Sequence, residues 1–87
     1  DIPAMSYEEE LRGRKLRIGT KQTTKAVENG IAAKVFVARD ADPKLTGKIA
    51  ALAKKHNVEV EYVDSMKQLG KACGIDVGAA MAAIVNE

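Results

Sequence analysis

Aromatic residues are scarce in this chain of 87 residues: they make up 3% of it, as Tyr7, Phe36 and Tyr62, and tryptophan is absent. Domains that bind single-stranded nucleic acid on an open sheet need several exposed aromatic side chains on which successive bases stack. The composition therefore excludes that mode of binding.

Reactive side chains are equally few. The single cysteine, Cys73, falls on the inward stripe of an expected helix, where a thiol is inert, and it can form no internal disulfide, which is typical of cytosolic proteins. The single histidine, His56, falls on the apolar side or border of another expected helix and has no candidate catalytic partner. No Cys/His cluster has zinc spacing. We therefore predict that the protein is not an enzyme and has no catalytic residue, metal or cofactor.

Phosphate-binding loops and targeting segments are also missing. The phosphate-binding motif needs serine or threonine directly after Gly-Lys, but Gly70-Lys71 is followed by alanine and Gly47-Lys48 by isoleucine. The dinucleotide motif G-x-G-x-x-G does not occur. No apolar run approaches membrane-spanning length, and no signal peptide is visible. We expect a cytoplasmic location and no membrane partner.

What is present indicates a folded protein, since 46% of the residues are hydrophobic and 30% are charged. The length fits one domain. We interpret residues 1–5 as a cloning scar or a disordered start, in which the scar would be the four residues ahead of Met5, the natural first residue. We interpret residues 6–87 as a single domain.

Positive charge is concentrated early in the chain. The formal net charge is +2, but residues 11–87 contain fourteen basic and eight acidic residues, a net charge of +6. Between Arg12 and Lys25 there are six basic residues and no acidic one. Such a run indicates either a surface that binds a polyanion or an ordinary solvated basic face, and charge alone does not decide between them.

Hydrophobic spacing and capping residues predict alternating helices and strands. Ser6 with Glu9 is a capping-box pattern, Asp42-Pro43 reads as N-cap and first helical residue, and Ser65 caps a short helix. The expected helices cover about 7–14, 20–29, 43–56 and 66–73, and the expected strands cover 16–18, 35–38, 58–62 and 79–85. The last segment fits helix or strand by periodicity, and we predict a strand because it would complete the sheet. The order predicts an α/β fold, a three-layer α/β/α sandwich with a central mixed sheet of about four strands.

The third strand is expected to have an apolar and a polar face. Val58, Val60 and Tyr62 alternate with Glu59 and Glu61. The two carboxylates are expected on the solvated face and not as an acid/base pair.

The segment from Gly19 to Lys25 is the best candidate for a binding site, because it opens the second helix. The N-terminus of a helix has unpaired N–H groups and positive potential, which attract anions and acceptor-rich edges. Helical spacing separates two faces: the core face is expected to hold Thr23, Ala26, Val27 and Gly30, and the outer face Lys21, Gln22 and Lys25.

These side chains favour the edges of bases in a groove. Lysine donates to guanine O6 and N7, and a glutamine carbonyl accepts from guanine N1–H and N2–H₂. Regular A-form RNA hides its major-groove edges, so a distorted element is the expected target.

Three blocks of the sequence resemble the kink-turn-binding ribosomal protein family, the L7Ae-like proteins, and most closely its small bacterial members. The blocks are Leu16–Gly30, Ala38–Pro43 and Leu69–Ile75, in that order and at suitable spacing. The resemblance covers nearly the whole chain from Ser6. It implies an α/β/α sandwich that binds kink-turns, which are internal loops with tandem sheared G·A pairs beside a three-nucleotide bulge.

The resemblance also implies which residues contact RNA. The block that grips the guanine edges contains Gly19, Thr20, Lys21, Gln22 and Lys25. Lys25 matches the guanine-contacting lysine of the family, whereas Lys21-Gln22 departs from the Asn-Glu of archaeal and eukaryotic members.

Three further candidates come from the other blocks. The loop Ile75-Asp76-Val77 matches the segment beside the extruded bulge nucleotide, although an ordinary helix-to-strand turn would also explain it. Asp42 aligns with an RNA contact, but its capping role accounts for it equally. Arg39 is a weaker candidate for a phosphate contact.

We therefore expect a monomer that binds and stabilises a kink-turn in ribosomal RNA or in another structured RNA such as a riboswitch. The alternative is a ribonucleoprotein subunit that has no kink-turn specificity of its own. A third hypothesis, an accessory domain of an RNA-modifying enzyme, is disfavoured.

Overall fold

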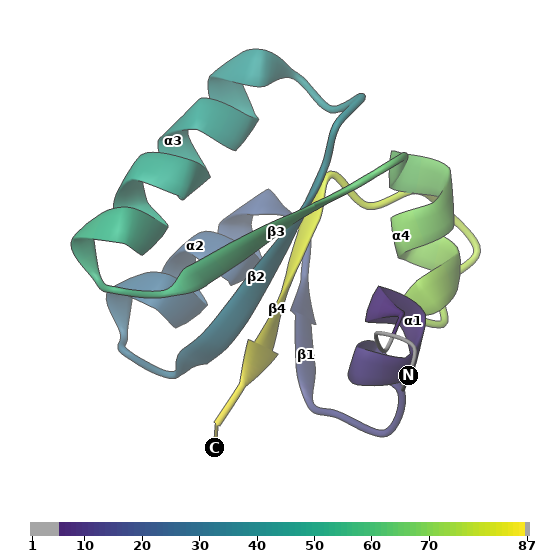
Figure 1. Ribbon diagram of the computed structural model, residues 1–87, viewed down its shortest axis with the longest axis horizontal. Coiled ribbons are helices and arrows are strands. Elements are labelled where there is room, and N and C mark those ends of the chain that lie inside the picture. Colours follow the sequence, from purple (N-terminus) through teal and green to yellow (C-terminus); the bar gives the residue numbers. More distant parts are fainter. Residues whose placement is uncertain (1–5, 87) are drawn as a thin grey trace, which may run out of the picture.

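A four-stranded sheet separates two pairs of helices in the computed structural model, which describes residues 6–86 (Figure 1). The helices are α1 (Tyr7–Leu11), α2 (Thr20–Glu28), α3 (Pro43–Lys55) and α4 (Met66–Ala72), and the strands are β1 (Leu16–Ile18), β2 (Ala32–Ala38), β3 (Glu59–Val63) and β4 (Met81–Val85). The three-layer α/β/α prediction is confirmed. The interpretation of residues 1–5 concerns a segment outside the described residues.

The strand order is β1-β4-β2-β3, with β2 and β3 parallel and β4 antiparallel to both of its neighbours. The carboxyl ends of β1, β2 and β3 therefore meet the amino end of β4 at one edge of the sheet, which we call the carboxyl edge. It is the upper edge in Figure 1. The segment that sequence periodicity left ambiguous is a strand, and all five residues of β4 are buried in the interior of the sheet.

Each face of the sheet has its own core. One core lies under α2 and α3 and includes Val27, Val37 and Ile49. The other lies under α1 and α4 and includes Phe36 and Leu69. Because neighbouring residues of β2 point to opposite faces, its continuous apolar run serves both cores.

The first expected helix is too long, and one expected core residue is exposed. The first helix ends at Leu11 and not near Arg14, because Arg12 is already extended and Gly13 has a φ of 72°. Gly30 is exposed and not in the core. It has a φ of 74° directly after the helix C-cap, and its N–H donates to the carbonyl of Val27, so it ends α2.

Two expected burial patterns also differ from the structure. His56 is exposed as the C-cap of α3 and does not lie on its apolar side. Tyr62 shares the alternation of the apolar face, yet it is 46% exposed, whereas the next residue of the same edge strand, Val63, points to the other face and is buried.

The carboxylates of Glu59 and Glu61 in β3 were expected to face solvent, but both form ion pairs with a lysine. The ammonium of Lys34 lies 2.8 Å from Glu61 and 3.3 Å from Glu59, and 2.9 Å from Glu10 of α1. Glu61 is partly buried. This cluster connects α1, β2 and β3 on one face of the sheet.

The helices of residues 6–86 are too short or too polar to cross a membrane.

Candidate functional site

The amino end of α2 is held against the centre of the sheet by Gly19. The N–H of Gly19 donates to the carbonyl of Met81 at 2.9 Å, and its own carbonyl accepts from the N–H of Thr23 at 2.9 Å. Gly19 has φ 97° and ψ 165°, a conformation that is essentially restricted to glycine. Because Gly19 adopts this conformation, it alone connects the end of β1 to the first residue of α2, which fixes where α2 begins.

The two faces of α2 separate as predicted. Thr23, Ala26 and Val27 are buried, and the Thr23 hydroxyl donates to the carbonyl of Arg17 at 3.4 Å. Lys21, Gln22 and Lys25 are exposed. The first N–H groups of a helix have no partner within the helix, and Gly19 has no side chain that could accept from them. The tip of α2 therefore presents N–H donors, an amide and two ammonium groups on one surface.

The sheet topology brings the other sequence blocks to the same edge. Arg39 follows β2, and the loop 75–80 leads into β4 between the ends of β1 and β2. Backbone hydrogen bonds join these segments: Ala38 N–H donates to Ala80 at 2.9 Å, and Arg39 N–H donates to Val63 at 2.8 Å. Candidate residues that are up to 58 positions apart in the sequence thus lie along the carboxyl edge.

The loop Ile75-Asp76-Val77 is fixed on α4. Ile75 is half-buried against the core, and its N–H donates to the carbonyl of Gly70 at 3.0 Å. A Cβ on Gly70 would overlap the carbonyl of Val77, so the loop backbone lies directly on that glycine. Asp76 is exposed, and the side chain of Val77 is 68% exposed. The loop therefore offers an apolar group to solvent from a rigid backbone.

The side chains of Asp42 and Arg39 have different neighbours within the protein. A carboxylate oxygen of Asp42 accepts from the N–H of Lys44 at 2.9 Å and caps α3, as its sequence position predicted. The exposed guanidinium of Arg39 lies 5.8 Å from the ring centroid of Tyr62. This neighbour was not predicted from the sequence, although parallel pairing of the two strands places the two residues close together.

The basic run does not form one patch. Arg12 and Arg14 precede β1, and the carbonyl of Lys15 accepts from the N–H of Val85 at the carboxyl end of β4. These residues lie at the edge opposite the tip of α2. The candidate site contains the part of the run in α2, Lys21 and Lys25.

A hollow of about 260 Å³ adjoins the tip of α2. It lies between α2 and α3 and is lined by Thr20, Thr24, Leu45, Lys48, Ile49 and Leu52. Thr24 and Lys48 were not among the candidates from the sequence. Lys48 lies three residues after Leu45 and four before Leu52, so the three share one face of α3.

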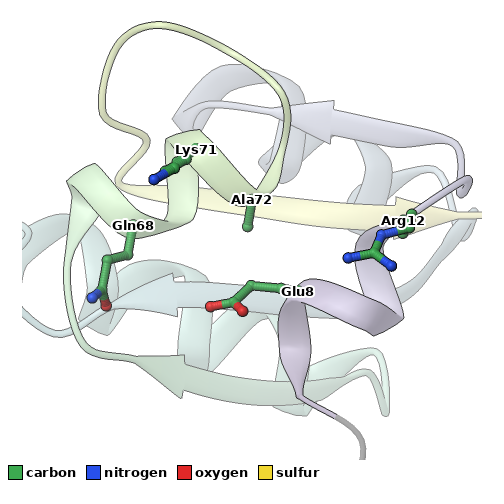
Figure 2. Close-up of a pocket in the computed structure, with 5 residues that line it drawn as sticks. All are labelled: Glu8, Arg12, Gln68, Lys71 and Ala72. Carbon is green, nitrogen blue, oxygen red and sulfur yellow. The ribbon is translucent and has the colours of Figure 1, made fainter.

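A second hollow, of about 430 Å³, lies between α1 and α4 and contains none of the predicted site residues. Figure 2 shows Glu8 and Arg12 at one side and Gln68, Lys71 and Ala72 at the other. Its lining combines one acidic and two basic side chains with an amide.

The single cysteine, Cys73, is partly buried on the α1 and α4 side of the sheet. Burial raises the pKa of the Cys73 thiol above its ordinary value, so the thiol is protonated at neutral pH. Within the described residues, no group of three or more His, Cys, Asp or Glu side chains is placed to hold a metal ion.

Comparisons with known proteins agree on the fold and on the family. Residues 6–87 match the model of a family described as ribosomal protein L7Ae/L30e/S12e/Gadd45. The chain is 54% identical over 82 residues to the RNA-binding protein YbxF of Geobacillus stearothermophilus, covering 94% of this chain and 100% of the relative. It is 49% identical over 81 residues to an RNA-binding protein of Bacillus pumilus, covering 93% and 99%. Among solved structures it resembles the 15.5kD RNA binding protein of Giardia lamblia, with a TM-score of 0.79, 26% identity and coverage of 93% and 67%.

Proposed function

Because the chain belongs to the family described as ribosomal protein L7Ae/L30e/S12e/Gadd45, we propose that it is an RNA-binding protein that recognises kink-turns and stabilises their bent form. Relatives that it covers over nearly their full length are named RNA-binding proteins, which supports RNA as the partner. The contact residues that we propose are Gly19, Thr20, Lys21, Gln22, Lys25, Arg39, Asp42, Ile75, Asp76 and Val77.

The observation that carries the proposal is the arrangement of the carboxyl edge. The tip of α2 and the loop 75–77 approach the amino end of β4 from opposite faces of the sheet, and both have a fixed backbone. The tip of α2 presents hydrogen-bond donors and positive charge, and the loop presents the apolar side chain of Val77. A kink-turn has a matching pair of features, since its G·A pairs expose guanine edges beside a bulge with an unstacked nucleotide.

The chemistry of recognition follows from the exposed side chains of α2. Lys25 donates to guanine O6 or N7, and Gln22 offers a carbonyl acceptor to the N1–H and N2–H₂ donors of guanine. Lys21-Gln22 stands where archaeal and eukaryotic members have Asn-Glu, so this chain has one more cation and one fewer charged acceptor at these two positions. We infer that each base contact is less specific and that binding depends more steeply on salt.

Binding acts on the RNA by shifting its conformational equilibrium. Free kink-turn RNA exchanges between extended and bent forms, and a rigid protein surface that fits the bent form stabilises it by its differential affinity. The protein then serves as a folding or assembly factor for ribosomal RNA or another structured RNA such as a riboswitch. We further propose that it acts as a cytoplasmic monomer.

The proposal is tested by titrating the protein against a kink-turn RNA and against the same RNA with Watson–Crick pairs in place of the G·A pairs. Preferential binding to the first RNA is expected, together with a change in its end-to-end distance measured by fluorescence energy transfer. Equal affinity for both RNAs would refute kink-turn recognition and favour a ribonucleoprotein subunit without specificity of its own.

A further inference from the structure

Arg39 and Tyr62 form an exposed pair at the carboxyl edge. Arg39 is the first residue after β2, and Tyr62 lies in β3 opposite Val37. The Cζ atom of Arg39 is 5.8 Å from the ring centroid of Tyr62, within the range of a cation–π contact. The backbone is fixed beside them, because Arg39 N–H donates to Val63 at 2.8 Å.

Packing of the core does not account for this pair. Tyr62 is 46% exposed, whereas its neighbour Val63 is 4% exposed and fills the core. Among the described residues, the exposed large hydrophobic side chains are Tyr62 and Val77, and both lie at the carboxyl edge. The pair is therefore a surface feature of the edge that we propose as the binding site.

The ring restricts the guanidinium before any ligand arrives. A free arginine loses much rotamer freedom when it binds, and an arginine already held against an aromatic ring loses less. The N–H donors of a guanidinium lie in its own plane, where they match two oxygens of a phosphate. Because the guanidinium lies over the ring, 5.8 Å from its centroid, the pair presents a fork of N–H donors at the carboxyl edge.

We propose that Arg39, positioned by Tyr62, binds a phosphate of the RNA backbone and extends the RNA interface from α2 across the sheet to β3. This inference rests on the proposed function. The tip of α2 follows β1, and the Arg39–Tyr62 pair lies at β2 and β3. Three strand spacings, about 14 Å in total, separate β1 from β3, so RNA docked on the tip of α2 passes Arg39 within a few nucleotides. Figure 1 shows the ends of β2 and β3 at the same end of the sheet as the start of α2.

The test measures affinity for kink-turn RNA over a range of salt concentrations in a double-mutant cycle. We expect Arg39→Ala to weaken binding about tenfold and to lower the slope of log affinity against log salt by about one. Tyr62→Ala is expected to weaken binding severalfold, and Tyr62→Phe, which retains the ring, to bind like the wild type. The double variant Arg39→Ala/Tyr62→Ala should bind no more weakly than Arg39→Ala alone, because Tyr62 acts through the arginine.

Unchanged affinity or an unchanged salt slope in Arg39→Ala would overturn the inference, and additive losses in the double variant would remove the positioning role of Tyr62. Thermal unfolding of each variant controls for folding, and Tyr62→Leu replaces Tyr62→Ala if the alanine variant does not fold. The proposed function is judged separately by the wild-type protein. Failure of that function appears as equal wild-type affinity for the two RNAs, whereas failure of this inference leaves that discrimination intact.

Discussion

The carbonyl of Val77 lies so close to the Cα of Gly70 that a Cβ on Gly70 would overlap the carbonyl oxygen. This contact sets the position of the loop 75–77 on α4, since Gly70 also accepts a hydrogen bond from Ile75 through its own carbonyl. The loop is half of the proposed RNA interface, so a glycine inside a helix determines the shape of a binding surface.

We predict that Gly70→Ala destabilises the protein by about 1–3 kcal/mol, because the added methyl group meets backbone that cannot turn away. RNA affinity should also fall, because the loop must move. Urea unfolding and RNA titration measure the two effects. Gly47→Ala in α3 is the matched control: a Cβ there meets open space, and the change should stabilise the helix by up to about 1 kcal/mol. A Gly70→Ala variant as stable as the wild type would contradict this account.

Gly19→Ala is predicted to act through backbone strain. A Cβ at Gly19 meets nothing, but the φ of 97° with ψ of 165° is costly for alanine, by about 1–3 kcal/mol. The tip of α2 should shift, and kink-turn affinity should fall with stability. Gly30→Asn is the control, since its φ of 74° lies where asparagine is tolerated. Equal losses in the two variants would indicate that the conformation of Gly19 has no special importance.

Local signals in the sequence were sufficient to predict most element starts. Ser6, Asp42 and Ser65 each accept a hydrogen bond from a helix N–H, as their spacing predicted. Capping depends on a few neighbouring residues, so it is visible without tertiary information.

Properties that depend on distant pairing were not predictable. Nothing local in the alanine-rich 79–85 segment shows that β4 lies between β1 and β2, and strand order decides which residues share an edge. The same holds for Tyr62, which is exposed although Val63, beside it on the edge strand β3, is buried. It also holds for Lys34, whose three carboxylate partners lie 24 to 27 residues away in sequence. The candidate site was identified by resemblance and by helix patterning, whereas the role of Gly70 required the structure.

Lys34 should stabilise the fold in a pH-dependent way. Burial lowers the pKa of its ammonium, but hydrogen bonds to Glu61, Glu10 and Glu59 outweigh burial and raise the pKa above the ordinary value of 10.5. A raised pKa in the folded state means that the stabilisation is fully present below the ordinary value and is lost as the pH rises toward the folded value.

We therefore predict that Lys34→Met lowers the free energy of unfolding by about 1–3 kcal/mol at neutral pH, since it leaves three carboxylates without their cation. The difference from the wild type should be constant from about pH 7 to 10 and should shrink at more alkaline pH. Chemical unfolding across this range checks the prediction, with the exposed Lys54→Met as control. A difference that already shrinks near neutral pH would contradict the assignment.

Lys25→Ala tests the guanine contact. If Lys25 donates to a guanine edge, the substitution should weaken kink-turn binding by about 1–3 kcal/mol and reduce discrimination between the G·A and Watson–Crick RNAs. The residue is exposed, so stability should be unaffected. An equal loss of affinity for both RNAs would mean that Lys25 contacts only a phosphate.

Lys21→Ala separates a phosphate contact from a base contact. Each phosphate that a protein neutralises releases counterions, so removing one such cation lowers the slope of log affinity against log salt by about one and weakens binding to both RNAs alike. Lys55→Ala removes the same charge at the last residue of α3, at the far edge of the sheet, and should leave the slope unchanged. If the two variants change the slope equally, the salt dependence reflects net charge and not a contact at the tip of α2. A change confined to Lys21→Ala places a phosphate beside the first turn of that helix, where its N–H groups point outward and its positive potential is strongest.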